Sequence, residues 1–101
     1  KSASRCLWSE DEERDIHKGK LFELSVDGWV FMTHRTRVRH CALPVSAETT
    51  VAEVRARVEM WLGARAAELT LLSGPVLLED EGTLGNHEIG RGARILAMAS
   101  F

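Results

Sequence analysis

The clearest structural signal in the chain lies between Thr50 and Gly63, a segment that reads TVAEVRARVEMWLG. Thr50 and Glu53 have the spacing of a capping box, in which both side chains accept backbone N–H groups at the start of a helix. Gly63 follows the last apolar residue and suits the left-handed conformation that ends many helices. We therefore predict a helix over residues 51–62.

This predicted helix is amphipathic and needs another element to cover its apolar side. Its apolar residues recur at helical spacing, and charged residues occupy the opposite side. A lone helix of about three turns is marginal in water, so it must pack on a partner. The apolar positions are Val51, Val54, Val58 and Trp61 or Leu62.

Short segments on both sides of the helix predict the strands of a mixed sheet. Before the helix, residues Val38–Val45 alternate between apolar residues and His40, Ala42 and Pro44, which is typical of a strand with one buried face. After the helix, three short apolar segments predict further strands. They are Leu69–Ser73, Val76–Leu78 and Arg94–Ala99.

The beginning of the sheet has two interpretations. Asp27 and Gly28 separate two apolar segments, which predicts a hairpin turn between them. Either Leu21–Val26 or Trp29–His34 could then be the first strand of the main sheet. Chain length favours Trp29–His34, with a tight turn at residues 35–37 before the next strand.

These predictions divide the chain into three parts. Residues 1–19 are highly charged around Ser9–Asp15 and lack apolar periodicity, which indicates a flexible acidic tail. Residues 20–28 form an N-terminal extension or an extra strand. Residues 29–101 form the folded domain. It is expected to be the only one, because a chain of 101 residues supports one hydrophobic core.

The segment Leu78–Ile89 reads LEDEGTLGNHEI and is the most specific motif in the chain. Its acidic and glycine residues predict an exposed bend, and Thr83 is placed to cap a short helical turn. Leu84 and Ile89 are predicted to anchor that turn to the core. His87 stands near the end of the turn and could tie the loop to the backbone.

Together with residues 50–58 and 69–74, this motif resembles the ubiquitin family, over about Trp29–Phe101. The matching pattern is L-E-D-x-x-T-L-x-x-x-x-I. The resemblance implies an α+β fold, the ubiquitin-like β-grasp, in which a mixed sheet of four to five strands packs on one main helix. The family has a tyrosine where this chain has His87, which implies a weaker tie in that loop.

The resemblance also implies a non-catalytic, monomeric protein-interaction domain, part of a larger protein. Its expected partners are ubiquitin-binding domains and other proteins of the ubiquitin pathway or the proteasome. By alignment, the family's apolar surface patch corresponds to Leu71, Leu96 and Met98. Strand alternation would place Leu71 outward if Leu72 or Thr70 faces the helix. It would place Leu96 and Met98 outward if Ile95 or Ala97 does, and a shift of one residue would bury these side chains instead.

Two other functions remain open at this stage. Conjugation in the family requires a C-terminal Gly-Gly, and the sequence ends Ala99-Ser100-Phe101. A conjugated modifier is the alternative if Gly-Gly follows Phe101 in the full-length chain. A further alternative is a β-grasp scaffold that associates through the acidic residues Glu79, Asp80 and Glu81.

The charge distribution argues against nucleic-acid and membrane partners. Net charge is −2 and the isoelectric point about 6.1, and no apolar segment approaches the length of a membrane span. We therefore expect a soluble cytoplasmic or nuclear protein. A secondary basic patch is predicted at Arg35, Arg37 and Arg39, either as a solvated turn, as a contact for phosphates or an acidic partner, or as a surface on which the acidic tail folds back.

Catalytic and cofactor chemistry is not indicated by the motifs. No nucleophile elbow, phosphate-binding loop or paired zinc spacing occurs, so we expect no catalytic residue, metal or cofactor. Of the two cysteines, Cys41 alternates with Leu43 in a predicted strand, which indicates a buried core thiol.

Overall fold

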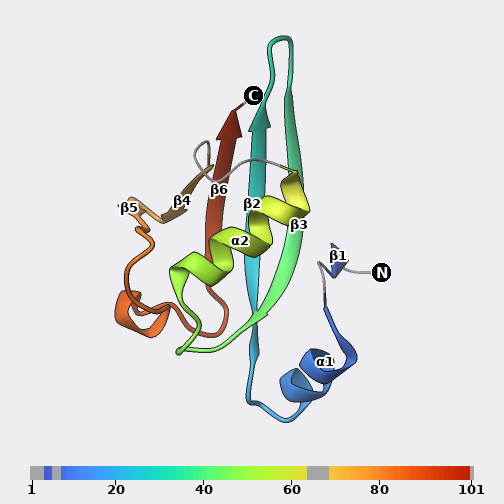
Figure 1. Ribbon diagram of the computed structural model, residues 1–101, viewed down its shortest axis with the longest axis vertical. Helices are drawn as coiled ribbons and strands as arrows, with labels where there is room; N and C mark the ends of the chain where they lie inside the picture. The colour runs from blue at the N-terminus through green and yellow to red at the C-terminus, as the bar shows by residue number, and fades with distance from the viewer. Residues whose placement is uncertain (1–3, 6–7, 64–68, 101) are drawn as a thin grey trace.

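Figure 1 shows the computed structural model of the chain, which describes residues 4–5, 8–63 and 69–100. Helix α2 lies across one face of a mixed sheet, with strand order β1-β3-β2-β6-β4-β5. Pairing is parallel for β2 with β6 and for β1 with β3, and antiparallel elsewhere. The elements are β1 (Ser4–Arg5), α1 (Glu10–His17), β2 (Phe22–Phe31), β3 (Thr36–Val45), α2 (Val51–Leu62), β4 (Leu69–Ser73), β5 (Val76–Leu77), the 3-10 helix η2 (Gly85–His87) and β6 (Arg94–Ser100).

Helix α2 begins and ends where the sequence predicts. The Thr50 hydroxyl accepts the Glu53 N–H at 3.1 Å, and the Glu53 carboxylate accepts the Thr50 N–H at 2.9 Å. Gly63 ends the helix with a φ of 74°, a conformation that glycine adopts without steric cost. The buried side of α2 consists of Val51, Val54, Val58 and Leu62.

The core lies between α2 and the sheet, as the amphipathic pattern requires. The segment Leu78–Ile89, which we call the acidic bend, closes one end of the core through Leu84 and Ile89, both of which are buried as predicted. Thr83 and Asn86 hold this bend, since each side chain accepts the other residue's backbone N–H. In the described structure His87 makes no such side-chain hydrogen bond, so Asn86 supplies the tie that was expected from His87.

The prediction of a hairpin turn at Asp27-Gly28 is wrong. Both segments that flank it belong to one ten-residue strand, β2, and the chain reverses between β2 and β3 instead, where the Met32 N–H donates to the Arg35 carbonyl at 2.8 Å. Gly28 is buried against α2, where an added Cβ would lie 2.9 Å from Leu62 Cδ2 and from Trp61 Cζ3. This glycine therefore makes room for the helix and does not bend the chain.

The predicted acidic tail contains a helix, so its expected lack of structure is wrong for Glu10–His17. Helix α1 starts with its own capping box between Ser9 and Glu12, a pattern that sequence reasoning overlooked. The Glu12 carboxylate pairs with Arg57 of α2, and not with the predicted basic patch.

The N-terminal segment also covers the edge of β3. Its residues Ser4–Arg5 pair in parallel with Cys41 and Ala42, and the Trp8 indole N–H donates to the Ala42 carbonyl at 2.8 Å. All five residues of β3 from Cys41 to Val45 are buried, where sequence alternation predicted one exposed face. Among the described residues, no helix is long and apolar enough to span a membrane.

Candidate protein-interaction face

The face of the sheet opposite α2 carries a continuous set of apolar side chains from all five strands β2 to β6. Alternation along each strand sends every second side chain to this face, and the register brings those side chains together across strands. Met98 on β6 pairs with Thr70 on one side and with Trp29 on the other. We call this surface the outer apolar face; it consists of Trp29, Phe31, Val38, Leu72, Leu77, Leu96 and Met98.

Two aromatic residues occupy the β2 part of the outer apolar face. Trp29 and Phe31 are 39% and 36% exposed, and their ring centroids lie 6.3 Å apart. Val38 on β3 pairs with Trp29 and is also exposed. Large exposed apolar side chains that cluster in this way commonly mark interaction sites.

The other half of the outer apolar face is aliphatic. Leu72 on β4 pairs with Leu96 on β6 and with Leu77 on β5. Leu72 and Leu96 are half-buried, whereas Leu77 is 52% exposed. A partner that covered this row would remove further apolar area from water, which favours association.

The structure places two of the three predicted surface residues on the outer apolar face and the third in the core. Leu96 and Met98 point away from α2 and are half-buried, as expected. Leu71 is 0% exposed and belongs to the core, so its predicted place on the surface is wrong. The neighbour Leu72 takes that place, because β4 has the one-residue shift that was the alternative. Binding by any of these residues stays a prediction.

Sequence reasoning missed Trp29, Phe31 and Val38 as members of this surface. Trp29 was assigned to a strand, but its partner strand and facing direction depended on the misplaced turn. In the structure β2 is one continuous strand, and its residues Val26, Gly28 and Val30 are buried. Because side chains alternate along a strand, Trp29 and Phe31 point to the opposite face.

A polar cluster borders the outer apolar face beside Leu96. Asp27 accepts hydrogen bonds from Arg94 Nη1 at 2.9 and 3.1 Å and from His40 Nδ1 at 2.6 Å. Partial burial raises the pKa of Asp27, but hydrogen bonds and positive charge from His40 and Arg94 outweigh it, so the pKa lies below its ordinary value of 3.8. Asp27, His40 and Arg94 therefore satisfy one another's hydrogen bonds, and they form a polar rim beside the outer apolar face.

The predicted basic patch lies on the hairpin that joins β2 to β3. Arg35, Arg37 and Arg39 are all exposed. Arg39 lies with its guanidinium 5.2 Å from the ring centroid of Trp61 and donates to the Trp61 carbonyl at 2.9 Å. Its role in binding stays a prediction.

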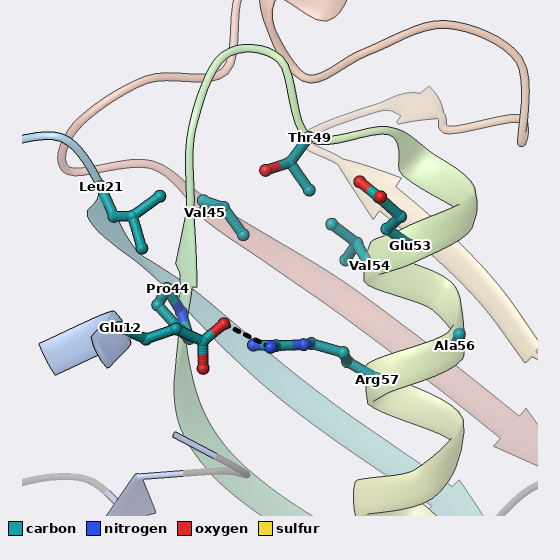
Figure 2. A pocket seen from close by; sticks show the side chains of 9 residues that line it. All are labelled: Glu12, Leu21, Pro44, Val45, Thr49, Glu53, Val54, Ala56 and Arg57. Atoms are coloured by element: carbon teal, nitrogen blue, oxygen red, sulfur yellow. Dashed lines mark hydrogen bonds and ion pairs between the residues drawn. The ribbon is translucent and has the colours of Figure 1, made fainter. Parts of the chain in front are cut away.

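A pocket of about 360 Å³ lies between α1 and α2 (Figure 2). Glu12 and Arg57 meet across it and neutralise each other, and much of the remaining lining is apolar, including Leu21 and Val54. This ion pair therefore links α1 to α2 across the pocket, and neither the Glu12 nor the Arg57 charge is free for chemistry. The lining residues are Glu12, Leu21, Pro44, Val45, Thr49, Glu53, Val54, Ala56 and Arg57.

The acidic bend is held by the body of the protein. Asp80 accepts a hydrogen bond from Arg55 Nε of α2 at 2.6 Å, and Arg55 also donates to the Leu69 carbonyl.

Cys41 is buried in the core, as its alternation predicted. Across the described ranges, no group of three or more His, Cys, Asp or Glu side chains is arranged to hold a metal ion.

Comparison with known proteins identifies the architecture. No protein-family model matches the chain, and no curated protein matches it. The chain is similar in structure to the ubiquitin of Caldiarchaeum subterraneum, with a TM-score of 0.67 and 16% identity over 78% of this chain and 92% of that one.

A second solved structure has the same arrangement. It is the N-terminal ubiquitin-like domain of the 4931431F19Rik protein, with a TM-score of 0.58 and 15% identity over 78% of this chain and 74% of that one. At these identities the likeness concerns the fold, which agrees with the sheet order and the single covering helix. The chain therefore has the ubiquitin-like β-grasp fold.

Proposed function

We propose that this chain is a non-catalytic protein-interaction domain that binds partners of the ubiquitin pathway through the outer apolar face. The observation that carries the proposal is the row of apolar side chains that runs from Leu77 through Leu72 and Leu96 and continues through Met98 to Trp29. Each of these side chains faces away from α2 and retains exposed surface.

The partner that we propose for this surface is an amphipathic helix. An amphipathic helix presents anchors at helical spacing to an apolar surface. Trp29 offers a large aromatic contact, and the Asp27–Arg94 pair provides a polar rim beside the aliphatic row. Such an interface is at the small end of the usual range, so we expect weak and transient binding.

The test is an NMR titration of the labelled chain with a helical ubiquitin-binding domain. We expect the largest shifts at Trp29, Leu72, Leu96 and Met98. The substitution Met98→Glu should weaken binding about tenfold or more, because it places a charge in the middle of a desolvated contact, a loss of roughly 1.4 kcal/mol or more.

Met60→Glu is the matched control. Met60 lies on α2 and is 71% exposed, so the same change of side chain there leaves the outer apolar face intact. Thermal melts of both variants show whether each still folds. Equal binding by the two variants, or shifts confined to α2 and the acidic bend, would reject the outer apolar face as the site.

A further inference from the structure

Helix α1 packs on the domain without burying any of its own residues. None of its eight residues is buried, and in Figure 1 the helix lies outside the layer that α2 forms over the sheet. Segments with few buried apolar contacts open at a smaller free-energy cost than the core of a protein. We therefore expect α1 to separate from the domain more easily than α2 or the central strands.

Polar contacts attach α1 and the residues before it to β3 and α2. The Trp8 indole N–H donates to the Ala42 carbonyl at 2.8 Å. The Glu12 carboxylate pairs with Arg57 and also accepts the Ser9 N–H, so the ion pair is fixed to the first turn of α1. Water can replace contacts of this kind when the segment moves away, which lowers the cost of opening.

The attached state leaves one polar group of Arg57 unsatisfied. Arg57 Nη2 pairs with Glu12, whereas Nη1 is buried and has no hydrogen-bond partner in the described structure. A buried donor without an acceptor costs the free energy of its lost hydration. If Glu12 moved away, water could reach Nη1 and restore that hydration. The residue that holds α1 in place therefore also favours its release.

The turn after α1 has the properties of a hinge. Residues 18–20 are exposed, and Gly19 has a φ of 82°, in a region that glycine shares with few other residues. Arg91 Nη2 donates to the Gly19 carbonyl at 3.2 Å, and Leu21 already lines the pocket between α1 and α2. The turn is thus attached to the domain on its β2 side, and rotation about Gly19 moves α1 alone.

We propose that residues 8–17 form a strap that opens and closes over the pocket between α1 and α2 as one unit, while α2 and strands β2 to β6 stay folded. In the closed state Glu12 neutralises Arg57 and covers the apolar lining of the pocket (Figure 2). In the open state the Arg57 guanidinium and this apolar lining reach water together, and strand β1 is released in the same step. The strap is an internal cover for a cationic and apolar surface. It does not depend on the function proposed for the outer apolar face.

Native-state hydrogen exchange of the labelled full chain in low urea tests whether the strap opens as a unit. The amides of Ile16, His17 and Lys18 and the Trp8 indole N–H should share one opening, at least about tenfold more frequent than the opening of β2 and β6. It should depend less on urea, because it exposes less surface than global unfolding. Rates that are graded along α1, or equal to those of β2 and β6, would overturn the proposal.

The double variant Glu12→Gln/Arg57→Met tests the role of the unsatisfied donor. It replaces the ion pair by a neutral and an apolar side chain and removes Nη1. Opening should be about threefold rarer than in the original chain, whereas Glu12→Gln alone should make it about threefold more frequent. Arg35→Met is the matched control, because Arg35 is exposed on the hairpin between β2 and β3, and it should leave exchange in α1 unchanged. Opening of the double variant as frequent as in Glu12→Gln would refute the part assigned to Nη1.

Binding of 8-anilinonaphthalene-1-sulfonate, an anion with an apolar body, tests whether opening uncovers the pocket. Glu12→Gln should bind this dye about threefold more tightly than the original chain, in proportion to its larger open fraction. The double variant opens less and lacks the guanidinium, so it should bind more weakly than the original chain. Thermal melts show that each variant still folds. Equal dye binding by all three chains would reject the strap as a cover for this surface.

Discussion

Replacement of Gly28 by alanine tests whether this glycine exists to admit helix α2. The new Cβ would lie 2.9 Å from Leu62 Cδ2 and from Trp61 Cζ3, and 3.1 Å from Trp61 Cη2. Carbon atoms in good contact lie roughly 3.5–4.0 Å apart, so α2 and β2 would have to separate or both side chains would have to move.

The two side chains have little freedom to move. Leu62 is buried in the core, and the indole of Trp61 is rigid and held by Arg39 across its face. Overpacking of this kind costs about 1–3 kcal/mol. Alanine in a strand otherwise gains roughly 0.5–1 kcal/mol over glycine. We therefore expect Gly28→Ala to lose on the order of 1 kcal/mol and to lower Tm by about 4–8 °C.

Urea denaturation and thermal melts measure this change, and Gly90→Ala is the matched control. At Gly90 an added Cβ meets no atom within 4 Å, so alanine there should be neutral or stabilising. Trp61→Leu should reduce the cost of Gly28→Ala, because it removes one of the two contacts. A Gly28→Ala variant as stable as the Gly90→Ala variant would refute the packing explanation.

Three further variants test the helices and the polar rim. Thr50→Ala should cost about 1 kcal/mol in urea denaturation, because it removes the cap of α2; an unchanged midpoint would contradict that role. Asp27 contributes stability above pH 3.8, its ordinary pKa, and this contribution is lost as pH falls below that value through the lowered pKa of the folded state. Asp27→Asn should therefore flatten the acid limb of the stability curve, and an identical acid limb would argue against the rim. Glu12→Gln should speed hydrogen exchange in α1 and cost ~0.2–1 kcal/mol, because it removes the ion pair with Arg57; unchanged exchange would show that α1 is held by other contacts.

Local chemistry accounts for the parts of the fold that were predicted correctly. The capping box of Thr50 and the glycine at position 63 act on neighbouring backbone groups, so the limits of α2 follow from the sequence. Strand β4 was predicted over its observed range, and the anchors Leu84 and Ile89 are buried as expected. Each of these features depends on residues close together in the chain.

The candidate surfaces depended on contacts between distant residues. Asp27-Gly28 has the composition of a hairpin turn, but Trp61 and Leu62 of α2 need the space that Gly28 leaves, and the strand continues through it. That continuation turns the rings of Trp29 and Phe31 outward.

Leu71 and Leu72 show the same limit at the scale of one residue. Both are leucines in one short strand, and alternation alone allows either of them to face the core. The pairing of Leu71 with Ala97 of β6 buries Leu71 and places Leu72 beside Leu96 on the outer apolar face. The facing direction of a strand residue is set by its neighbours across the sheet, and those neighbours come from other parts of the chain.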